Sequence, residues 1–315
     1  MLARGTLYDK LWDAHVIDRV SGGAAGDPDM LYIDLHLVHD GTYRRAFEVL
    51  DERGLAVRRP GRTFAVTDHC LPTSDRGRPL PAVVTGLQAA SARHGIAVFG
   101  PADPRQGIVH VIGPELGLTQ PGISVACADS HTTTHGALGA LAFVVGTTQV
   151  LHALATQCIL QRRAKTMRIE ITGALAPGVT AKDLILALIG AHGASGGVGY
   201  AIEFAGEAVR ALPVEARLTL CNMGVEFGAW TVIIAPDEAV FDYVRGRPYA
   251  PQGQALDQAI ASWRALHSDA GARFDRELTL DCSTLAPQVT WGTSPQHETG
   301  IDGAVPDPAL EADAN

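Results

Sequence analysis

The sequence predicts an α/β protein with mainly parallel sheets, and three observations indicate this class. Short apolar runs of strand length alternate with segments whose apolar residues recur at three- and four-residue steps. With 315 residues, 46% of them apolar, the chain is long enough for two ordinary domains and a sizeable core. Polar side chains gather where apolar runs end, which is where ligands collect in open α/β sheets.

The elements of the first half follow from these patterns. Leu7, Leu11 and Ala14 share one side of a helix expected at 6–16, and a loop rich in Gly and Asp follows at 21–28. The remaining periodic segments of this half extend to about residue 113. They predict helices at 43–53 and 81–95 and strands at 31–38, 62–67, 96–99 and 107–113.

The segment 123–161 predicts a strand followed by one long helix. The apolar run 123–128 has strand length, and Leu138, Leu141, Val145 and Leu151 then follow at helical steps, so the helix is expected to close near Gln161. A short basic patch at 162–165 is expected to be an exposed connector. We therefore place a domain boundary there, with domains at 1–165 and 166–284.

The second half repeats the alternation. Strands are expected at 167–172, 201–204, 230–235 and 276–282, and helices at 181–191, with Thr180 as N-cap, 236–245 and 254–267. The Gly-rich turn 193–199 lacks the spacing of a phosphate-binding loop. From Leu285 to Asn315 the periodicity is lost, and this segment is expected to be a linker or tail where a third domain would begin.

Composition excludes several classes of protein. The net charge of −9 argues against binding to nucleic acid or to an anionic membrane surface. No apolar run reaches the length of a membrane span, and the N-terminus has no apolar signal core. The five scattered cysteines form no CxxC pair and suggest no disulfide framework. We therefore expect a cytoplasmic protein with reduced thiols.

The densest group of reactive side chains is Asp129, Ser130 and His131. They follow the strand 123–128 directly, and a helix N-terminus there would offer unpaired N–H groups to an anionic ligand. The structural alternative is that Ser130 caps the helix and Asp129 holds the turn. Because the run is flanked by small residues that let a ligand approach, we favour a functional site.

Four further residues are candidates, each with a structural alternative. Asp68 and His69 close a strand, where a carboxylate could tune an imidazole as general acid, or the two could simply form a turn. His110 lies in an apolar run, where a lone histidine is more often a core residue than a catalyst. Glu226 lies among apolar and small residues, four after Asn222, so both would share one helix face; the structural alternative is an exposed glutamate on an amphipathic helix.

A metal site is not predicted from the histidine spacing. His131 and His135 are four residues apart and would share a face of a helix. The sequence between them, however, lacks the glutamate of an HExxH motif, and no third ligand is evident.

Together these segments resemble the aconitase family, and within it the isopropylmalate dehydratases. The matching motifs cover nearly the whole chain in the order of the family. They include TLYDKLWDAHV, YIDLHLVHD, GRTFAVTDH, QGIVHVIGPELGLTQPG, ADSHTTTHGALGALAFVVGTTQVLHALATQ, GVTAKDLILALIGAHGASGGVGY, EFAGEAVRAL, LTLCNMGVEFGA, APDEAVFDYV and PQVTWGTSP.

The resemblance implies three-layer α/β/α domains and a hydro-lyase that moves a hydroxyl group between adjacent carbons of a branched dicarboxylic acid, as in leucine biosynthesis. Asp68 and His69 would help protonate the departing hydroxyl, and His110 would support that hydroxyl site, paired with Glu226. Asp129 and His131 would hydrogen-bond the iron-bound oxygen of the family mechanism.

Two further roles come from the same resemblance. Ser130 would bind a substrate carboxylate, and Asn222 would lie close to the iron–sulfur cluster.

The family also uses a [4Fe–4S] cluster held by three cysteines of a third domain. None of the five cysteines here stands at a family ligand position, so those ligands are expected on a partner chain. A small subunit that carries the swivelling domain and the proton-abstracting serine is the second expected partner. Alternatives are a hydro-lyase for a methylmalate- or homoaconitate-type diacid, a non-catalytic diacid-binding or regulatory module, and a truncated remnant.

Overall fold

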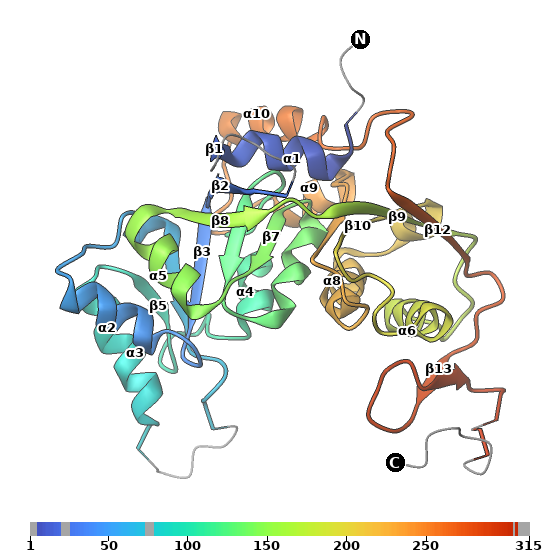
Figure 1. The fold of residues 1–315 in the computed structure, drawn as a ribbon, viewed down its shortest axis with the longest axis horizontal. Coiled ribbons are helices and arrows are strands. Elements are labelled where there is room, and N and C mark those ends of the chain that lie inside the picture. Colours follow the sequence, from blue (N-terminus) through green and yellow to red (C-terminus); the bar gives the residue numbers. More distant parts are fainter. Residues whose placement is uncertain (1–4, 20–25, 73–78, 305, 308–315) are drawn as a thin grey trace.

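Two parallel β-sheets flanked by helices form the frame of the chain, as the sequence predicted (Figure 1). The computed structural model describes residues 5–19, 26–72, 79–304 and 306–307. The predicted loop at 21–28 therefore lies largely outside the described residues. No described helix is both long and apolar enough to cross a membrane.

The first sheet has five parallel strands in the order β5-β4-β3-β6-β7. Its order reverses between β3 and β6, because the chain adds β4 and β5 on one side of β3 and returns to place β6 and β7 on the other. In open α/β sheets, ligands bind at the carboxyl ends of the strands beside such a reversal. The strands are β3 (Leu35–His39), β4 (Thr63–Val66), β5 (Ala97–Phe99), β6 (Ser124–Cys127) and β7 (Leu141–Val144).

Helices cover both faces of this sheet, because its strands are apolar on both sides. Leu35 and Leu37 point to the face covered by α4, and Val38 points to the face covered by α2, α3 and α5. Figure 1 shows α2, α3 and α5 gathered at one end of the molecule. The helices are α2 (Arg44–Glu52), α3 (Ala82–Arg93), α4 (Val109–Glu115) and α5 (Thr147–Thr156).

The second sheet has four parallel strands in the order β11-β10-β9-β12. Its core is filled by the apolar sides of the surrounding helices. The strands are β9 (Lys165–Thr172), β10 (Tyr200–Ala205), β11 (Thr231–Ile234) and β12 (Arg276–Asp281). The helices are α6 (Ala181–His192), α7 (Glu207–Ala211), α8 (Val214–Asn222), η4 (Met223–Val225), α9 (Glu238–Val244) and α10 (Gln254–Trp263).

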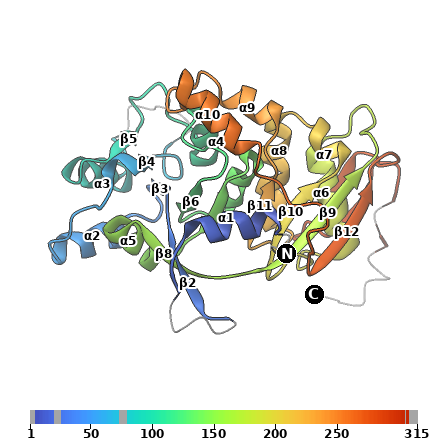
Figure 2. The ribbon, with the colours of Figure 1, turned by 90° about the horizontal axis from the view of Figure 1, so that it is seen from above.

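Smaller elements complete the fold. Seen from above, α1 lies centrally, near β10 (Figure 2). An antiparallel sheet has the order β1-β2-β8, and a final antiparallel pair, β13 and β14, lies on α6. These elements are α1 (Leu7–His15), β1 (Val16–Arg19), β2 (Pro28–Tyr32), η2 (Pro60–Arg62), β8 (Cys158–Arg162), β13 (Gln288–Thr290) and β14 (Glu298–Gly300).

Three predicted elements are wrong. The single strand at 31–38 is two strands in different sheets, β2 and β3. The chain turns at Asp34, whose carboxylate accepts hydrogen bonds from Ser124 N at 3.0 Å and lies 2.8 Å from Nε2 of His15. The strand expected at 107–113 is helix α4.

The third error concerns the long helix expected after residue 136. A 3₁₀ helix, η3 (Ser130–Leu138), ends at Gly139, whose φ of 78° is left-handed. The chain then forms β7, α5 and β8 in turn. The strand β7 pairs with β6, so the helical spacing of its apolar residues was misleading.

The antiparallel pair formed by β13 and β14 was not predicted, because residues from 285 onward show no periodic pattern. The pair is fixed to α6 by single polar contacts, such as Gln288 N donating to Asp183 Oδ1 at 2.7 Å. The boundary predicted at 162–165 lies between β8 and β9, which belong to different sheets. The division into domains itself stays a prediction.

Candidate active site

Polar side chains from three neighbouring strands meet at the carboxyl edge of the first sheet. Asp68 and His69 follow β4, and Asp129 follows β6, as the sequence predicted. The structure adds His39 and Asp40, which end β3, and these were missed. The signal that could have identified them is the same one: a His–Asp pair directly after a buried strand.

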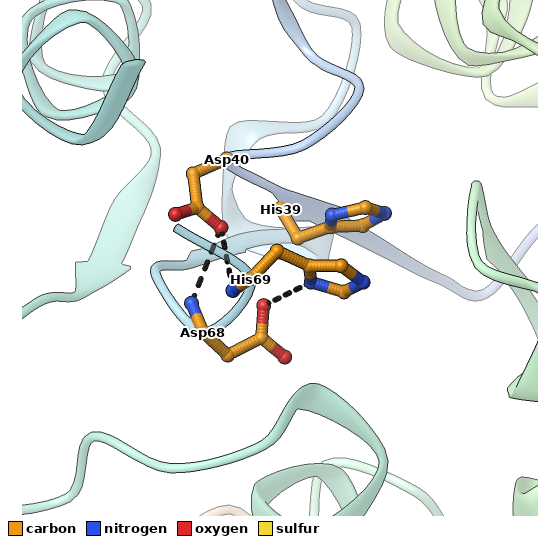
Figure 3. Close-up of side chains that lie close together, drawn as sticks. All are labelled: His39, Asp40, Asp68 and His69. Carbon is orange, nitrogen blue, oxygen red and sulfur yellow. Dashed lines mark hydrogen bonds and ion pairs between the residues drawn. The ribbon is translucent and has the colours of Figure 1, made fainter. Parts of the chain in front are cut away.

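Asp40 holds the turn after β4 rather than a ligand. Its side chain accepts hydrogen bonds from the backbone N–H groups of Asp68, His69 and Cys70, at 3.2, 3.0 and 2.9 Å. The ring of His39 stacks on that of His69, with 3.9 Å between centroids (Figure 3). The position of His69 is therefore fixed through both its backbone and its ring.

His69 lies between two carboxylates. Its Nδ1 is 2.6 Å from Oδ1 of Asp68, and its Nε2 is 2.9 Å from Oδ2 of Asp129. Burial lowers the pKa of His69, but the hydrogen bonds and charges of the two carboxylates outweigh burial and raise the pKa above its ordinary value. Since the ring is 38% exposed, His69 is an imidazole with a raised pKa that a ligand can reach.

Asp68 is itself buried and doubly bound. While Oδ1 accepts from His69, Oδ2 accepts the backbone N–H of Val109 at 2.7 Å, at the start of α4. Only 3% of its side chain is exposed. Asp68 thus links the turn after β4 to the helix that carries His110.

Asp129 is the centre of the site. Its Oδ1 accepts from Nε2 of His110 and from the backbone N–H of His131, both at 2.7 Å, and its Oδ2 accepts from His69. Burial raises the pKa of Asp129, but these hydrogen bonds, led by that of His110, lower it well below its usual range. Asp129 is therefore a carboxylate held by three donors.

His131 forms the third imidazole–carboxylate pair. Its Nε2 lies 2.8 Å from Oε1 of Glu226, which follows η4. The expectation that His110 pairs with Glu226 is therefore wrong, because His110 faces Asp129 instead. Oε2 of Glu226 is buried and has no hydrogen-bond partner among the described residues.

The two predicted substrate-binding residues lie on either side of this pair. Ser130 is exposed at the start of η3, with its Oγ 3.1 Å from Nδ1 of His131. Asn222, at the end of α8, donates from Nδ2 to Oγ1 of Thr134 at 2.9 Å. Ser130 is open to a ligand, whereas the amide of Asn222 joins α8 to η3.

His135 does not share a face with His131. It is completely buried, with its Nε2 3.1 Å from Nδ1 of His110 and its Nδ1 2.7 Å from Oγ1 of Thr119. Burial lowers the pKa of His135 well below its ordinary value. His135 is therefore an uncharged ring behind the site.

One group of side chains in the described part has the spacing of a metal site: His39, Asp40, Asp68 and His69, with ligand atoms within 4.8 Å of one another (Figure 3). Both oxygens of Asp40 and of Asp68 already accept hydrogen bonds. The charge of these carboxylates is thus compensated by backbone N–H groups and His69. The group is stable without a cation.

The described residues do not fit an iron–sulfur cluster. Cluster ligands are cysteine thiolates that lie close together, and Cys127, Cys221 and Cys282 are separately buried. Within the described part of the chain, the group with metal-site spacing contains no cysteine. This part of the chain therefore offers carboxylates and imidazoles but no set of thiolate ligands.

The arrangement supports acid–base chemistry. It combines a proton donor, His69, a fixed carboxylate, Asp129, and a second imidazole, His131, that faces the same carboxylate and is partly exposed. A charged donor and acceptor held side by side can protonate one atom of a ligand and hold another.

Comparison with known proteins identifies the family of this chain. The family model for the aconitase family (aconitate hydratase) matches residues 9–315. The chain is 54% identical over 314 residues to a protein of Bradyrhizobium diazoefficiens named 3-isopropylmalate dehydratase large subunit 1, covering 98% of this chain and 65% of that protein.

Large subunits of 3-isopropylmalate dehydratase from two other bacteria are similarly close. That of Roseiflexus castenholzii is 52% identical over 312 residues, covering 96% of this chain and 66% of the relative. That of Anaeromyxobacter dehalogenans is 51% identical over 319 residues, covering 98% and 66%. The chain thus spans slightly less than two thirds of the length of these curated relatives.

Proposed function

The chain belongs to the aconitase family, and we propose that it supplies the acid–base part of a hydro-lyase site of the 3-isopropylmalate dehydratase type. The observation that carries this proposal is the convergence of three imidazole–carboxylate pairs at one sheet edge: His69 with Asp68, His110 with Asp129, and His131 with Glu226. The names of the relatives support the reaction class.

The proposed reaction interconverts 2- and 3-isopropylmalate by loss and return of water. A base removes a proton from one carbon, the hydroxyl leaves the neighbouring carbon, and an added proton turns the hydroxyl into water. His69, whose pKa is raised by the two carboxylates beside it, would supply that proton. Asp68 and Asp129 then stabilise its charged form before transfer.

The other residues hold the substrate. Asp129 and His131 would hydrogen-bond the hydroxyl oxygen, supported by His110 and Glu226. Ser130, exposed at the N-terminus of η3, would bind one substrate carboxylate through its hydroxyl. Asn222 fixes the distance between η3 and α8.

We propose that the complete enzyme takes its remaining parts from outside the described residues. The [4Fe–4S] cluster would be held by thiolates of a further domain or of a partner chain, and a small subunit would supply the base. The relatives are named as large subunits, which supports a small-subunit partner.

The test combines the purified chain with a cluster-bearing partner and a small subunit, under anaerobic conditions. We expect hydration of an unsaturated branched diacid in the mixture, and iron and sulfide uptake only when the partner is present. His69→Gln should reduce kcat by about 10²- to 10⁴-fold, the usual contribution of a general acid. His152→Gln, at an exposed position of α5, is the matched control and should change little.

Two results would contradict the proposal. One is cluster formation in this chain alone, which would mean that its own cysteines are ligands. The other is the absence of turnover with any partner. If a branched diacid still bound to the chain by calorimetry without metal, the second result would favour a diacid-binding module.

A further inference from the structure

A buried polar chain lies behind His110, on the side away from Asp129. It runs from Nδ1 of His110 to Nε2 of His135 at 3.1 Å, and from Nδ1 of His135 to Oγ1 of Thr119 at 2.7 Å. His135 and Thr119 are completely buried, and 5% of His110 is exposed. The proposed acid–base roles assign no task to His135 or Thr119.

The direction of the hydrogen bonds can be worked out from the ends of this chain. Asp129 is a carboxylate and only accepts, so the Nε2 of His110 that faces it at 2.7 Å must carry hydrogen. The neighbouring His69 also faces Asp129, with its Nε2 2.9 Å from Oδ2. A neutral His110 with hydrogen on Nε2 then has a bare Nδ1, which must accept.

His135 completes the pattern. A neutral ring has one N–H, so His135 donates from Nε2 to His110, and its bare Nδ1 accepts from the hydroxyl of Thr119. Every polar atom of the three side chains then has the partner it requires. The reverse direction would need a second imidazolium in a buried position, which costs free energy.

Helix α4 is built to hold this chain. Gly113 is one turn after His110, and a Cβ at Gly113 would lie 2.7 Å from Cε1 of His135 and 3.0 Å from Oγ1 of Thr119. The N–H of Thr119 also donates to the carbonyl of Gly113 at 3.0 Å. The ring of His135 therefore fits because this position carries no side chain.

We propose that His135 is a positioning residue that, together with Thr119, holds His110 as the neutral tautomer with hydrogen on Nε2, aimed at Asp129. A fixed tautomer keeps Asp129 ionised and oriented. The part of this inference that gives His135 a role in the reaction rests on the proposed function. The tautomer itself does not depend on that function.

The primary experiment is ¹⁵N NMR of the full chain labelled in its histidine rings, at neutral pH. Ring nitrogens with and without hydrogen resonate in separate ranges. We expect Nδ1 of His110 and Nδ1 of His135 to be bare, and both Nε2 atoms to carry hydrogen. Hydrogen on Nδ1 of His110, or a bare Nε2 on His135, would overturn the proposal.

Two substitutions at His135 separate positioning from packing. His135→Gln keeps an N–H donor near the position of Nε2, and His135→Leu removes it at similar volume. We expect only the leucine variant to populate the His110 tautomer with hydrogen on Nδ1. In that variant the preference for the Nε2 tautomer should fall about tenfold, the typical effect of one hydrogen bond. Equal ¹⁵N spectra of His110 in both variants would contradict the inference.

The assembled enzyme offers a second readout. If the proposed function holds, His135→Leu should lower kcat with little change in KM, and His135→Gln should restore most of it. If the mixture shows no turnover, the NMR result still decides the tautomer. Failure of the proposed function and failure of this inference are thus distinguishable.

Discussion

The carboxylates of Asp40 and Asp68 lie close together but bind different groups. The carboxylate of Asp40 is occupied by three backbone N–H groups and shapes a turn, whereas that of Asp68 is shared between the backbone of Val109 and the ring of His69. Only Asp68 therefore acts on a group that a ligand can reach. Residue type alone does not distinguish these two aspartates.

Replacing Asp68 by Asn should lower the pKa of His69. The Asn carbonyl can still accept from Val109, but its NH₂ group would then face Nδ1 of His69 and favour the neutral ring. Because a raised pKa keeps the proton until the pH rises through it, the variant loses the proton at lower pH. The measurement is a ¹H NMR titration of the His69 ring in the chain alone.

The control for this titration is Asp13→Asn, which removes an exposed carboxylate on α1. It should leave the His69 titration unchanged. An unchanged His69 pKa in Asp68→Asn would mean that the imidazolium is stabilised by Asp129 alone. In the assembled enzyme, the alkaline limb of the rate profile should move to lower pH in Asp68→Asn.

His36 should make the fold sensitive to acid. It is completely buried in β3, and neither ring nitrogen has a hydrogen-bond partner among the described residues. Burial lowers the pKa of His36 to about 4. Below pH 6.5 the unfolded chain binds a proton that the folded chain does not, so the free energy of unfolding falls as pH drops toward 4.

Between pH 7 and pH 5 this loss amounts to about 2 kcal/mol. Urea unfolding of the wild type and of His36→Leu at pH 7 and pH 5 measures this loss of unfolding free energy, because the leucine variant has no side chain that titrates at this position. The pH-dependent loss should be smaller by that amount in His36→Leu and unaltered in His152→Gln. Equal losses in all three proteins would show that His36 has a partner in the folded state.

At the scale of elements, the sequence predicted those whose pattern is local. The helices α1, α2, α3 and α6 and all strands of the second sheet were predicted within a few residues. The errors lie where tertiary contacts decide. Helix α4 reads as apolar alternation, but its first N–H is bound by Asp68, 41 residues earlier. Residues 141–144 have helical spacing but pair with β6.

For the candidate site, too, the sequence identified single residues but not the contacts that depend on packing. Asp68 and His69 follow one buried strand, and Asp129 and His131 follow another, so the sequence identified both groups as candidates, and the family resemblance predicted that they belong to one site. The pairing of His110 with Asp129 was not predicted, because it depends on where α4 packs. His135 is a buried partner of His110, and its role is visible only once the fold brings them together.

The contact between η3 and β11 should tolerate no added side chain. A Cβ at Gly136 would lie 1.7 Å from the carbonyl oxygen of Val232, which is backbone and cannot move aside. We expect Gly136→Ala to lower the free energy of unfolding by about 3 kcal/mol or more, as overpacking of a close backbone contact does. Chemical denaturation measures this change.

The matched control is Gly61→Ala. A Cβ at Gly61 meets nothing within 4 Å, and its backbone is not left-handed. Its effect should stay below about 1 kcal/mol. A Gly136→Ala protein as stable as this control would mean that η3 can shift away from β11 without loss.

At the scale of the whole molecule, the two sheets share their cores. Ala137 and Leu138 of η3 pack into the core of the second sheet, while Ala201 and Ile233 of the second sheet pack into the core around α1 and α5. A buried hydrogen bond from Thr231 Oγ1 to the carbonyl of Ala142 crosses the same boundary. Neither sheet keeps a complete core without the other.

We therefore expect the two halves to unfold together. Trp12 lies in the core around α1 and Trp263 in the core of the second sheet, so ¹⁹F NMR of the fluorotryptophan-labelled chain reports on each core separately. Both signals should disappear at the same urea concentration, and Gly136→Ala should shift both midpoints equally, because η3 contacts β7 of the first sheet and β11 of the second. Separate midpoints, or a shift confined to Trp263, would establish two independently stable domains divided near residue 165.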